Sequence, residues 1–183
     1  MRQRLRRHIV LIGMMGAGKT ALGTELARRL HVPFTDSDVE IEAAAAMSIS
    51  EIFARDGEAF FRDREAQVIA RILRQSPRVI STGGGAWMQE RNRTAIRAAG
   101  LSVWLECDLD TLWHRVRQRS TRPLLQTADP KGTLARLLAE RNPTYALAEL
   151  TFPARPADSV DAATTRLLDA IRAADADLLI ETP

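Results

Sequence analysis

Residues 13–20 place the strongest constraint on the fold, because they read GMMGAGKT and match the pattern G-x-x-x-x-G-K-S/T. The apolar run HIVLIG at residues 8–13 precedes the pattern and is typical of a short buried strand. Apolar residues then recur at helical spacing over residues 19–30, before the stop at His31–Pro33. This strand–loop–helix context favours a phosphate-binding loop over a plain glycine turn that carries a surface lysine.

The chemistry of such a loop explains each part of the pattern. Glycines let the backbone curl so that its N–H groups point at phosphate oxygens, and the following helix adds the positive end of its dipole. Lys19 can reach the β- and γ-phosphates, and Thr20 can hold Mg²⁺. The sequence therefore predicts binding of a nucleoside triphosphate with magnesium. The expected nucleotide-binding residues of the loop are Gly13, Met14, Met15, Gly16, Ala17, Gly18, Lys19, Thr20 and Ala21.

The rest of the chain alternates short strands with helices. At 183 residues it makes about one domain, since domains take ~100–200 residues. Further strands are expected at 33–36, 78–81, 101–106 and 150–153, and helices at 39–46, 50–56, 58–74, 89–99, 109–119, 133–148 and 160–173. This order predicts a five-stranded parallel sheet with helices on both faces, a three-layer α/β/α fold. The arginine-rich start is expected to be a solvated lead-in, and the last ten residues a loose tail.

Charge and cysteine content limit the possible partners and compartments. The 26 basic residues exceed the 23 acidic ones, and only Lys19 and Lys131 are lysines. This arginine content reflects either a compositional bias or the recognition of carboxylates and phosphates. A basic pI of about 9.7 raises nucleic acid as a partner, but no helix-turn-helix, zinc or RNA-binding signature accompanies it. The early arginines and the apolar run resemble a signal peptide without a cleavage site, and no stretch is long enough to span a membrane. With the single cysteine Cys107, these features favour a cytoplasmic protein.

Two aspartates and a second glycine cluster point to an acceptor site beside the phosphate loop. Six of the ten glycines lie at 13–18 and 83–85, directly after predicted strands, where open α/β sheets bind ligands. Asp36 and Asp38 end the second strand, and their spacing in an extended segment puts both carboxylates on one side. One can bind magnesium and the other can orient a substrate hydroxyl. Alternatively, Asp38 caps the following helix.

Four arginines stand at informative positions. Arg62 lies in GEAFFRDRE, where Glu65 can fix its rotamer as a helical pair, and Arg141 lies in ERNPTY. Arg122 in RPLL can close over phosphates from a loop, and Arg115 can stack on a base. Each could instead be a solvated surface charge. The chain has no N-K-x-D motif for a GTPase switch and little room for a motor, so a small-molecule kinase is the simplest interpretation.

The segments GMMGAGKT, FTDSDVEIE, GEAFFRDRE, STGGGA, TRPLL and ERNPTY, in this order, closely resemble those of the shikimate kinases. The resemblance covers about Ile9 to Phe152. Many families share the P-loop, whereas the combination of the other segments is far more specific. The resemblance implies transfer of the ATP γ-phosphoryl group to the 3-hydroxyl of shikimate, a step of chorismate and aromatic amino acid biosynthesis. It also implies a P-loop kinase core with a helical substrate-binding segment at about 37–65 and a mobile lid at about 115–131. We expect residues 1–183 to form a single domain and the protein to be a monomer.

The same resemblance implies a role for each site residue. Asp36 and Thr20 would serve Mg²⁺, and Arg115 would pack on adenine. Lys19, Asp38 and Arg122 would be the catalytic residues, with Lys19 and Arg122 stabilising the transferring phosphoryl group and Arg122 also contacting ATP. The loop ends in Lys-Thr-Ala where the family often has Lys-Ser-Thr, and Thr20 keeps the hydroxyl. The expected shikimate-binding residues are Asp38, Arg62, Gly83, Gly84, Gly85 and Arg141, with the two arginines on the carboxylate.

Two alternatives stay open from the sequence. Another small P-loop kinase, such as a gluconate kinase, shares the core and an anionic polyol acceptor, although the FR and RPLL segments argue against it. A non-catalytic nucleotide-dependent or nucleic-acid-binding module would account for the basic pI.

Overall fold

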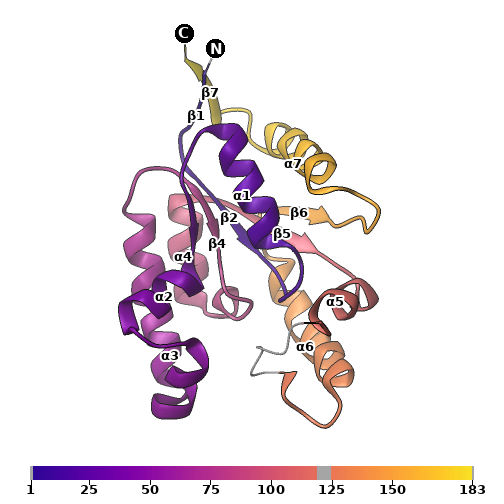
Figure 1. Cartoon of the computed structure of the whole chain (residues 1–183). Helices are drawn as coiled ribbons and strands as arrows, with labels where there is room; N and C mark the ends of the chain where they lie inside the picture. Colours follow the sequence, from indigo (N-terminus) through magenta and orange to yellow (C-terminus); the bar gives the residue numbers. More distant parts are fainter. Residues whose placement is uncertain (1, 119–124, 183) are drawn as a thin grey trace.

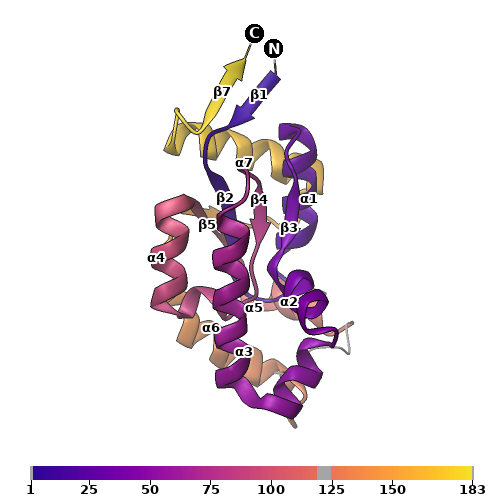
Figure 2. The same cartoon turned by 90° about the vertical axis from the view of Figure 1, so that its left-hand side faces the viewer.

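A five-stranded parallel sheet forms the centre of the computed structural model, which describes residues 2–118 and 125–182. The strand order is β3-β4-β2-β5-β6, so β2 lies in the middle between β4 and β5. The five-stranded, three-layer prediction is confirmed (Figures 1 and 2). The strands are β2 (His8–Ile12), β3 (Phe34–Asp36), β4 (Val79–Ser81), β5 (Gly100–Glu106) and β6 (Leu150–Pro153).

Burial on both faces explains why the strands are continuous apolar runs. Ile9, Val10, Leu11 and Ile12 of β2 are fully buried. A parallel sheet needs crossover helices between its strands, and these helices cover both faces. Side chains on both faces of β2 therefore pack against the covering helices, and a strand that alternated apolar and polar residues would place polar groups in the core.

The helices form the two outer layers. Helices α1 and α7 lie on one side of the sheet and α3 and α4 on the other, with α5 and α6 near the carboxyl ends of the strands (Figures 1 and 2). No helix in the described part of the chain is both long and apolar enough to cross a membrane. The helices are α1 (Lys19–Leu30), α2 (Ser37–Ala45), α3 (Ile49–Leu73), α4 (Glu90–Ala99), α5 (Leu109–Val116), α6 (Pro130–Tyr145) and α7 (Val160–Ala174), and η1 (Ala86–Met88) is a 3-10 turn.

The long helix α3 consists of two helices joined at Gly57, where φ is +84° and ψ is 173°. The sequence predicted separate helices at 50–56 and 58–74, and the break falls between them. Ser48 and Glu51 begin the first part with reciprocal side-chain-to-backbone hydrogen bonds, a capping box. Phe53 and Phe61 pack across the break with ring centroids 4.7 Å apart. The break thus redirects the chain while the two parts remain in contact.

Helix α6 begins earlier than predicted, at Pro130 rather than near residue 133. Asp129 caps it by accepting a hydrogen bond from the Gly132 N–H, and Pro130 fits the first turn because it lacks a donor that would be unpaired there. Pro143 lies inside the helix close to its end, so only a short segment follows it.

The prediction of a loose tail was wrong, and the arginine-rich start, although Arg4, Arg6 and Arg7 are exposed as expected, contributes a strand. Strand β1 (Arg2–Leu5) pairs antiparallel with β7 (Leu179–Thr182), in a register that places Leu5 opposite Leu179. Figure 1 shows this two-stranded ribbon projecting beyond the main sheet, with both termini at its end. Leu5 and Leu178 are buried at its base, and the Arg6 N–H donates to the Leu178 carbonyl. Each segment lacks a strong pattern alone, and pairing between opposite ends of the sequence orders both.

We expect Leu178→Ala to lower the free energy of unfolding by about 2–5 kcal/mol, because it leaves a cavity where a fully buried side chain packs. Leu178 is 1% exposed, whereas Ile180 on the adjoining strand is 38% exposed. Ile180→Ala is the matched control and should cost less than about 1 kcal/mol. Urea unfolding of both variants measures the difference. Equal, small effects would show that the C-terminal segment does not pack on the body.

Candidate active site

A cleft of about 1340 Å³ opens at the carboxyl ends of the parallel strands. Its walls come from the loop after β2, the start of α2, both parts of α3, the glycine loop after β4, and the ends of α5 and α6. It gathers most of the predicted site residues from segments far apart in sequence. Those that line it are Met15, Gly16, Ala17, Gly18, Lys19, Thr20, Ala21, Asp36, Asp38, Arg62, Gly83, Gly84, Gly85, Arg115 and Arg141.

Two of the predicted residues that the structure describes, Gly13 and Met14, do not line this cleft. Gly13 and Met14 lie beneath the loop: Met14 is 2% exposed, and a Cβ on Gly13 would lie 2.9 Å from the Leu105 carbonyl oxygen. Their carbonyl groups still act on the site, through Lys19. Arg122 falls at 119–124, outside the described residues, together with part of the expected lid at 115–131.

The phosphate loop needs glycine at three positions for its backbone shape, the first being Gly13 with a φ of +139°. Gly16 and Gly18 have φ angles of +81° and +93°, which disfavour residues with a Cβ. A Cβ on Gly16 would also lie 2.6 Å from Cγ1 of Val116 on α5. The loop therefore folds tightly against α5 and ends directly at Lys19, the first residue of α1. The N-terminal N–H groups of α1 consequently face the cleft.

Lys19 folds back over the loop. Its Nζ donates to the carbonyl oxygens of Gly13 and Met14, at 2.7 and 2.9 Å, and the residue is 9% exposed. These bonds hold the ammonium group above the loop, where a phosphate chain cradled by the backbone would meet it. On the α5 side, Arg115 Nη1 donates to the Gly16 carbonyl oxygen at 3.1 Å. Two cations are thus attached to the loop by its own carbonyl groups.

Thr20 and Asp36 form a pair of oxygen ligands next to the loop. Thr20 Oγ1 donates to Asp36 Oδ2 at 3.2 Å, and both residues line the cleft. The described residues contain no cluster of three or more His, Cys, Asp or Glu that could hold a metal alone. A hydroxyl and one carboxylate suit Mg²⁺, which takes few protein ligands and completes its shell with phosphate oxygens and water.

Asp36 and Asp38 do not share an extended segment, so the predicted geometry of this pair was wrong. The extended segment ends at Asp36, and Asp38 already lies in the first turn of α2. Asp36, not Asp38, is the helix cap, because its Oδ1 accepts from the Asp38 N–H at 2.9 Å. Both carboxylates still face the cleft, since the turn into the helix starts between them.

The glycine loop 83–85 brings three charged side chains against the backbone. A Cβ on Gly83 would lie 2.7 Å from Asp38 Oδ1, and one on Gly84 would lie 3.2 Å from Arg141 Nη1. A Cβ on Gly85 would lie 2.6 Å from Arg62 Nη1. Each glycine therefore leaves space for one charged group, and the three groups line a short strip of backbone. Their order along the strip is carboxylate, guanidinium, guanidinium.

Glu65 is the buried member of this cluster. It is fully buried, and its Oε1 accepts from Arg62 Nη1 at 2.9 Å, as the predicted helical pair requires. Its Oε2 has no hydrogen-bond partner among the described residues and lies near Gly83 and Asp38. Burial raises the pKa of Glu65, Asp38 raises it further, and Arg62 and Arg141 oppose the shift. Sequence spacing indicated the Arg62 pair but not this burial.

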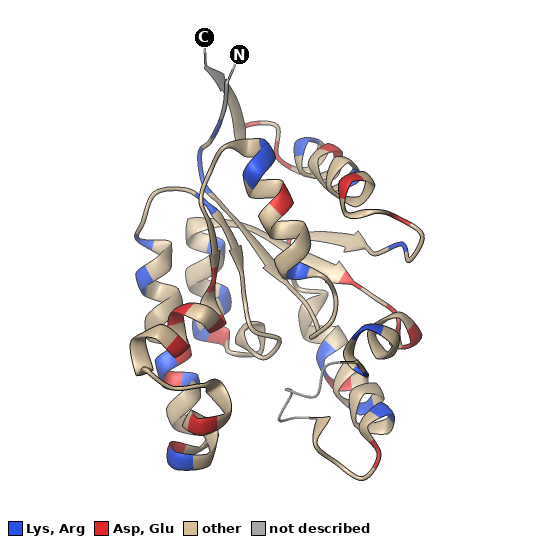
Figure 3. Cartoon of the chain, in the orientation of Figure 1, with Lys and Arg blue, Asp and Glu red and all other residues tan. Residues whose placement is uncertain are grey.

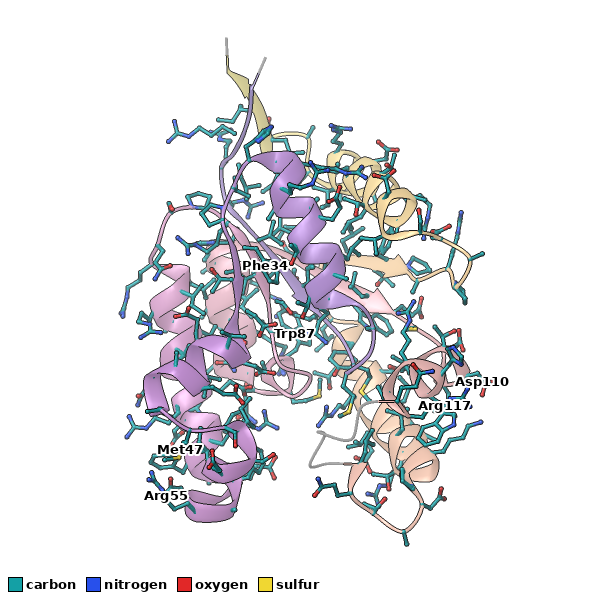
Figure 4. The ribbon with its side chains drawn as sticks, viewed as in Figure 1. Phe34, Met47, Arg55, Trp87, Asp110 and Arg117 are labelled. Carbon is teal, nitrogen blue, oxygen red and sulfur yellow. The ribbon has the colours of Figure 1, made fainter. Side chains whose placement is uncertain are left out.

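Two residues that were not predicted from the sequence, Trp87 and Tyr145, are fully buried beside the glycine loop. Trp87 lies inside the molecule (Figure 4), where its Nε1 donates to the Thr144 carbonyl oxygen at 2.9 Å. The Tyr145 hydroxyl donates to the Gly84 carbonyl oxygen. Tyr145 ends the segment ERNPTY and Trp87 follows the glycines closely, so proximity to known motifs was the available signal.

Comparison with known proteins places this site in a family. The family model described as shikimate kinase matches residues 15–172, which is most of the chain. The chain belongs to the shikimate kinase family. The shikimate kinase of Cereibacter sphaeroides is 63% identical over 147 residues, covering 80% of this chain and 74% of that protein. The shikimate kinase of Ruegeria pomeroyi is 56% identical over 167 residues, covering 91% and 86%.

Solved structures agree with the shikimate kinase assignment. The shikimate kinase of Acinetobacter baumannii, in complex with shikimate, has a TM-score of 0.87 at 35% identity and covers 91% of this chain and 93% of its own. A gluconokinase from Sinorhizobium meliloti reaches a TM-score of 0.56 at 17% identity, covering 91% and 95%. The second likeness shows a shared fold alone. The alternative of a gluconate kinase therefore has no support beyond the common core.

The raised pKa of Glu65 predicts a specific pH dependence of stability. An acid whose pKa is higher in the folded state destabilises that state as pH rises from its unfolded value, near 4.5, towards the native value. The free energy of unfolding of the wild type, relative to Glu65→Gln, should therefore fall as pH rises through this interval and then level off. Urea unfolding across pH measures it.

Glu25 on α1 is the matched control with the opposite sign. Hydrogen bonds from Arg28 and Arg29 lower the pKa of Glu25 to about 2. Relative to Glu25→Gln, the wild type should lose stability as pH falls from 4.5 towards that value. A Glu65 difference that also grew with rising pH would mean that Arg62 outweighs burial at this site.

Proposed function

We propose that this chain transfers the γ-phosphoryl group of ATP to the 3-hydroxyl of shikimate, giving shikimate 3-phosphate and ADP. One observation carries the proposal. In a chain of the shikimate kinase family, the P-loop lysine shares one cleft with the glycine loop 83–85, against which Asp38, Arg141 and Arg62 lie. The first half suits a nucleoside triphosphate. The second half suits an acceptor that carries both a carboxylate and hydroxyls.

The nucleotide half binds the phosphates and the base at separate points. Backbone N–H groups of the cleft-lining residues 15–21, including those at the N-terminus of α1, contact the phosphates, whereas Gly13 and Met14 act through their carbonyl bonds to Lys19. Lys19 lies above the loop, next to the β- and γ-phosphates, and offsets the charge that develops on the transferring group. Arg115 is attached to Gly16 and offers a flat guanidinium for stacking on adenine.

Thr20 and Asp36 hold Mg²⁺ in this proposal. Their oxygens lie 3.2 Å apart at the edge of the loop, and the donor set is the one that Mg²⁺ prefers. When bound, Mg²⁺ neutralises phosphate charge and orients the γ-phosphoryl group. Asp36 also caps α2, so the same carboxylate fixes the start of the helix that presents Asp38.

The acceptor half recognises a carboxylate and a hydroxyl at opposite ends of the glycine strip. Arg62 and Arg141 lie against Gly85 and Gly84, and planar guanidinium groups bind a carboxylate through paired hydrogen bonds. Asp38 lies at the Gly83 end, where its carboxylate accepts hydrogen bonds from hydroxyls. Arg62 donates to the buried Glu65, and this bond fixes the guanidinium at the carboxylate end of the strip, away from Asp38 at the hydroxyl end.

Catalysis in this arrangement is mainly positioning and charge compensation. Asp38 orients the attacking hydroxyl and accepts its proton late in the transfer. Lys19 stabilises the phosphoryl group as the bond to ADP breaks. Arg122 would add charge from a lid at 115–131, but it lies outside the described residues, and its role stays a prediction. The helical segment 37–65 carries Asp38, Arg62 and Glu65 and acts as the substrate-binding part of a single domain.

The proposal includes a monomer acting in the cytoplasm. One chain supplies every described residue that the reaction uses, which supports a monomer. ATP consumption and the lone Cys107 support the cytoplasm. Lys and Arg residues alternate with Asp and Glu along α1, α3 and α7 (Figure 3), and many pair directly, such as Arg29 with Glu25.

Coupled ADP release from MgATP tests the reaction. We expect strong stimulation by shikimate and none by gluconate or nucleoside monophosphates, with activity lost on chelation and restored by Mg²⁺. Stimulation by a different acceptor would keep the kinase fold and discard the acceptor roles of Asp38, Arg62 and Arg141. If no acceptor stimulates ADP release while MgATP still binds, the result would favour a non-catalytic nucleotide-binding module.

Asp38→Asn should lower kcat about a hundredfold or more, because the amide neither accepts the proton nor carries charge at the hydroxyl. ATP affinity should stay within about twofold, since the phosphate and Mg²⁺ contacts in this proposal come from the P-loop, Thr20 and Asp36 rather than from Asp38. Steady-state kinetics and nucleotide titration measure both. Glu40→Gln on the same helix is the matched control, because Glu40 pairs with Arg71 outside the cleft. A near-normal kcat for Asp38→Asn would remove Asp38 from the chemical step.

A further inference from the structure

Tyr145 links helix α6 to the glycine loop although no proposed role uses it. The residue is fully buried, and its ring stacks on Trp104 with centroids 6.0 Å apart and planes 26° apart. Its hydroxyl donates to the carbonyl oxygen of Gly84. Burial raises the pKa of Tyr145, although nearby Arg141 opposes the shift, so the hydroxyl stays protonated and donates at neutral pH.

The bond acts on one peptide unit, the one between Gly84 and Gly85. This peptide is trans, so its C=O and N–H groups point in opposite directions. With Tyr145 on the carbonyl side, the Gly85 N–H points away from Tyr145. Among the described residues, that N–H donates to no protein acceptor. This peptide is the central one of a turn that the Ala86 N–H closes by donating to the Gly83 carbonyl oxygen at 3.1 Å. Glycine at both central positions lets the peptide plane flip within the turn, and the tyrosine hydroxyl favours one of its orientations.

A second attachment joins the same helix end to the same loop. Trp87 Nε1 donates to the Thr144 carbonyl oxygen, and the Arg97 guanidinium covers the Trp87 ring at 5.6 Å. Arg141, one turn before Tyr145, lies against Gly84. The glycine loop and the end of α6 therefore form one unit, and the orientation of the Gly84–Gly85 peptide is tied to the position of Arg141.

We propose that Tyr145 is a positioning residue for recognition of the acceptor carboxylate, acting through the Gly84–Gly85 peptide. Gly85 adjoins Arg62 and Gly84 adjoins Arg141, whereas Asp38 adjoins Gly83. The peptide that Tyr145 orients therefore lies at the carboxylate end of the strip, and its N–H adds a third donor there. A hydrogen bond accepted at the carbonyl also polarises the N–H on the same peptide and strengthens it as a donor. This inference rests on the proposed function.

Tyr145→Phe removes the hydroxyl and keeps the ring, its volume and its stacking. We expect the Kd for shikimate to rise about three- to tenfold, the usual effect of one lost hydrogen bond. The Kd for ATP and kcat at saturating shikimate should each change less than about twofold. A cyclohexenetriol that carries the hydroxyls of shikimate without its carboxylate should bind the wild type and Tyr145→Phe about equally. Calorimetry and steady-state kinetics provide these values.

Thr164→Val is the matched control for a lost buried hydroxyl. Thr164 is fully buried on α7 and donates to the Val160 carbonyl oxygen at 2.7 Å; Val160 lines the cleft but Thr164 itself does not. It should lower stability by an amount similar to Tyr145→Phe and leave both acceptor affinities unchanged. This comparison separates a loss of stability from a loss of orientation.

The outcomes distinguish this inference from the proposed function. A wild type that shows no shikimate-dependent ADP release overturns the function and the inference together. With an active wild type, an unchanged shikimate Kd in Tyr145→Phe overturns the inference alone. Equal weakening of shikimate and the triol would also overturn it, because a general distortion of the pocket does not depend on the carboxylate.

Discussion

Charged side chains reach the backbone at the carboxyl ends of β2 and β4 because glycine leaves no Cβ there. The loop after β2 lets Lys19 fold back onto the Gly13 and Met14 carbonyl groups. The loop after β4 lets Asp38, Arg141 and Arg62 lie along three successive glycines. A side chain at any of the glycines 83–85 would displace the charged group that faces it, whereas the loop after β2 needs its glycines for positive φ angles. Both halves of the cleft thus depend on glycine, the first for backbone conformation and the second for space.

The acceptor half is built as a balanced group of charges before any ligand binds. Glu65 is fully buried, which costs free energy unless the carboxylate is neutralised or paired. Arg62 donates to it, and the charge of Arg141 also opposes the rise in the pKa of Glu65. The pairing holds the Arg62 guanidinium in place when the pocket is empty. Preorganised charge of this kind lowers the cost of binding an anionic acceptor.

Helices α2, α3 and α6 turn this local arrangement into a site with fixed dimensions. Asp36 caps α2 and thereby sets where Asp38 lies. Gly57 breaks α3, and the Phe53–Phe61 contact keeps its two parts together. On the opposite wall, Trp87 attaches the glycine loop to the end of α6. Each element therefore positions one functional group through a specific contact rather than through general compactness.

The features that depend on short-range sequence patterns could be predicted from the sequence alone. Residues close in sequence predict the P-loop between a strand and a helix, the five parallel strands, the break near Gly57 and the Arg62–Glu65 pair.

Other features depend on pairing or burial between segments that are distant in sequence, and these could be seen only in the folded molecule. The β1–β7 ribbon joins the two ends of the sequence, and neither segment forms a strand without the other. Helix α2 begins at Ser37, so Asp36 rather than Asp38 is its N-terminal cap. The residue at which the helix begins decides which carboxylate accepts from the unpaired N–H groups of its first turn. Glu65 and Tyr145 are buried because elements distant in sequence pack around them. Hydrophobic periodicity does not predict such burial, because it does not identify a polar group that is enclosed by residues from elsewhere in the chain.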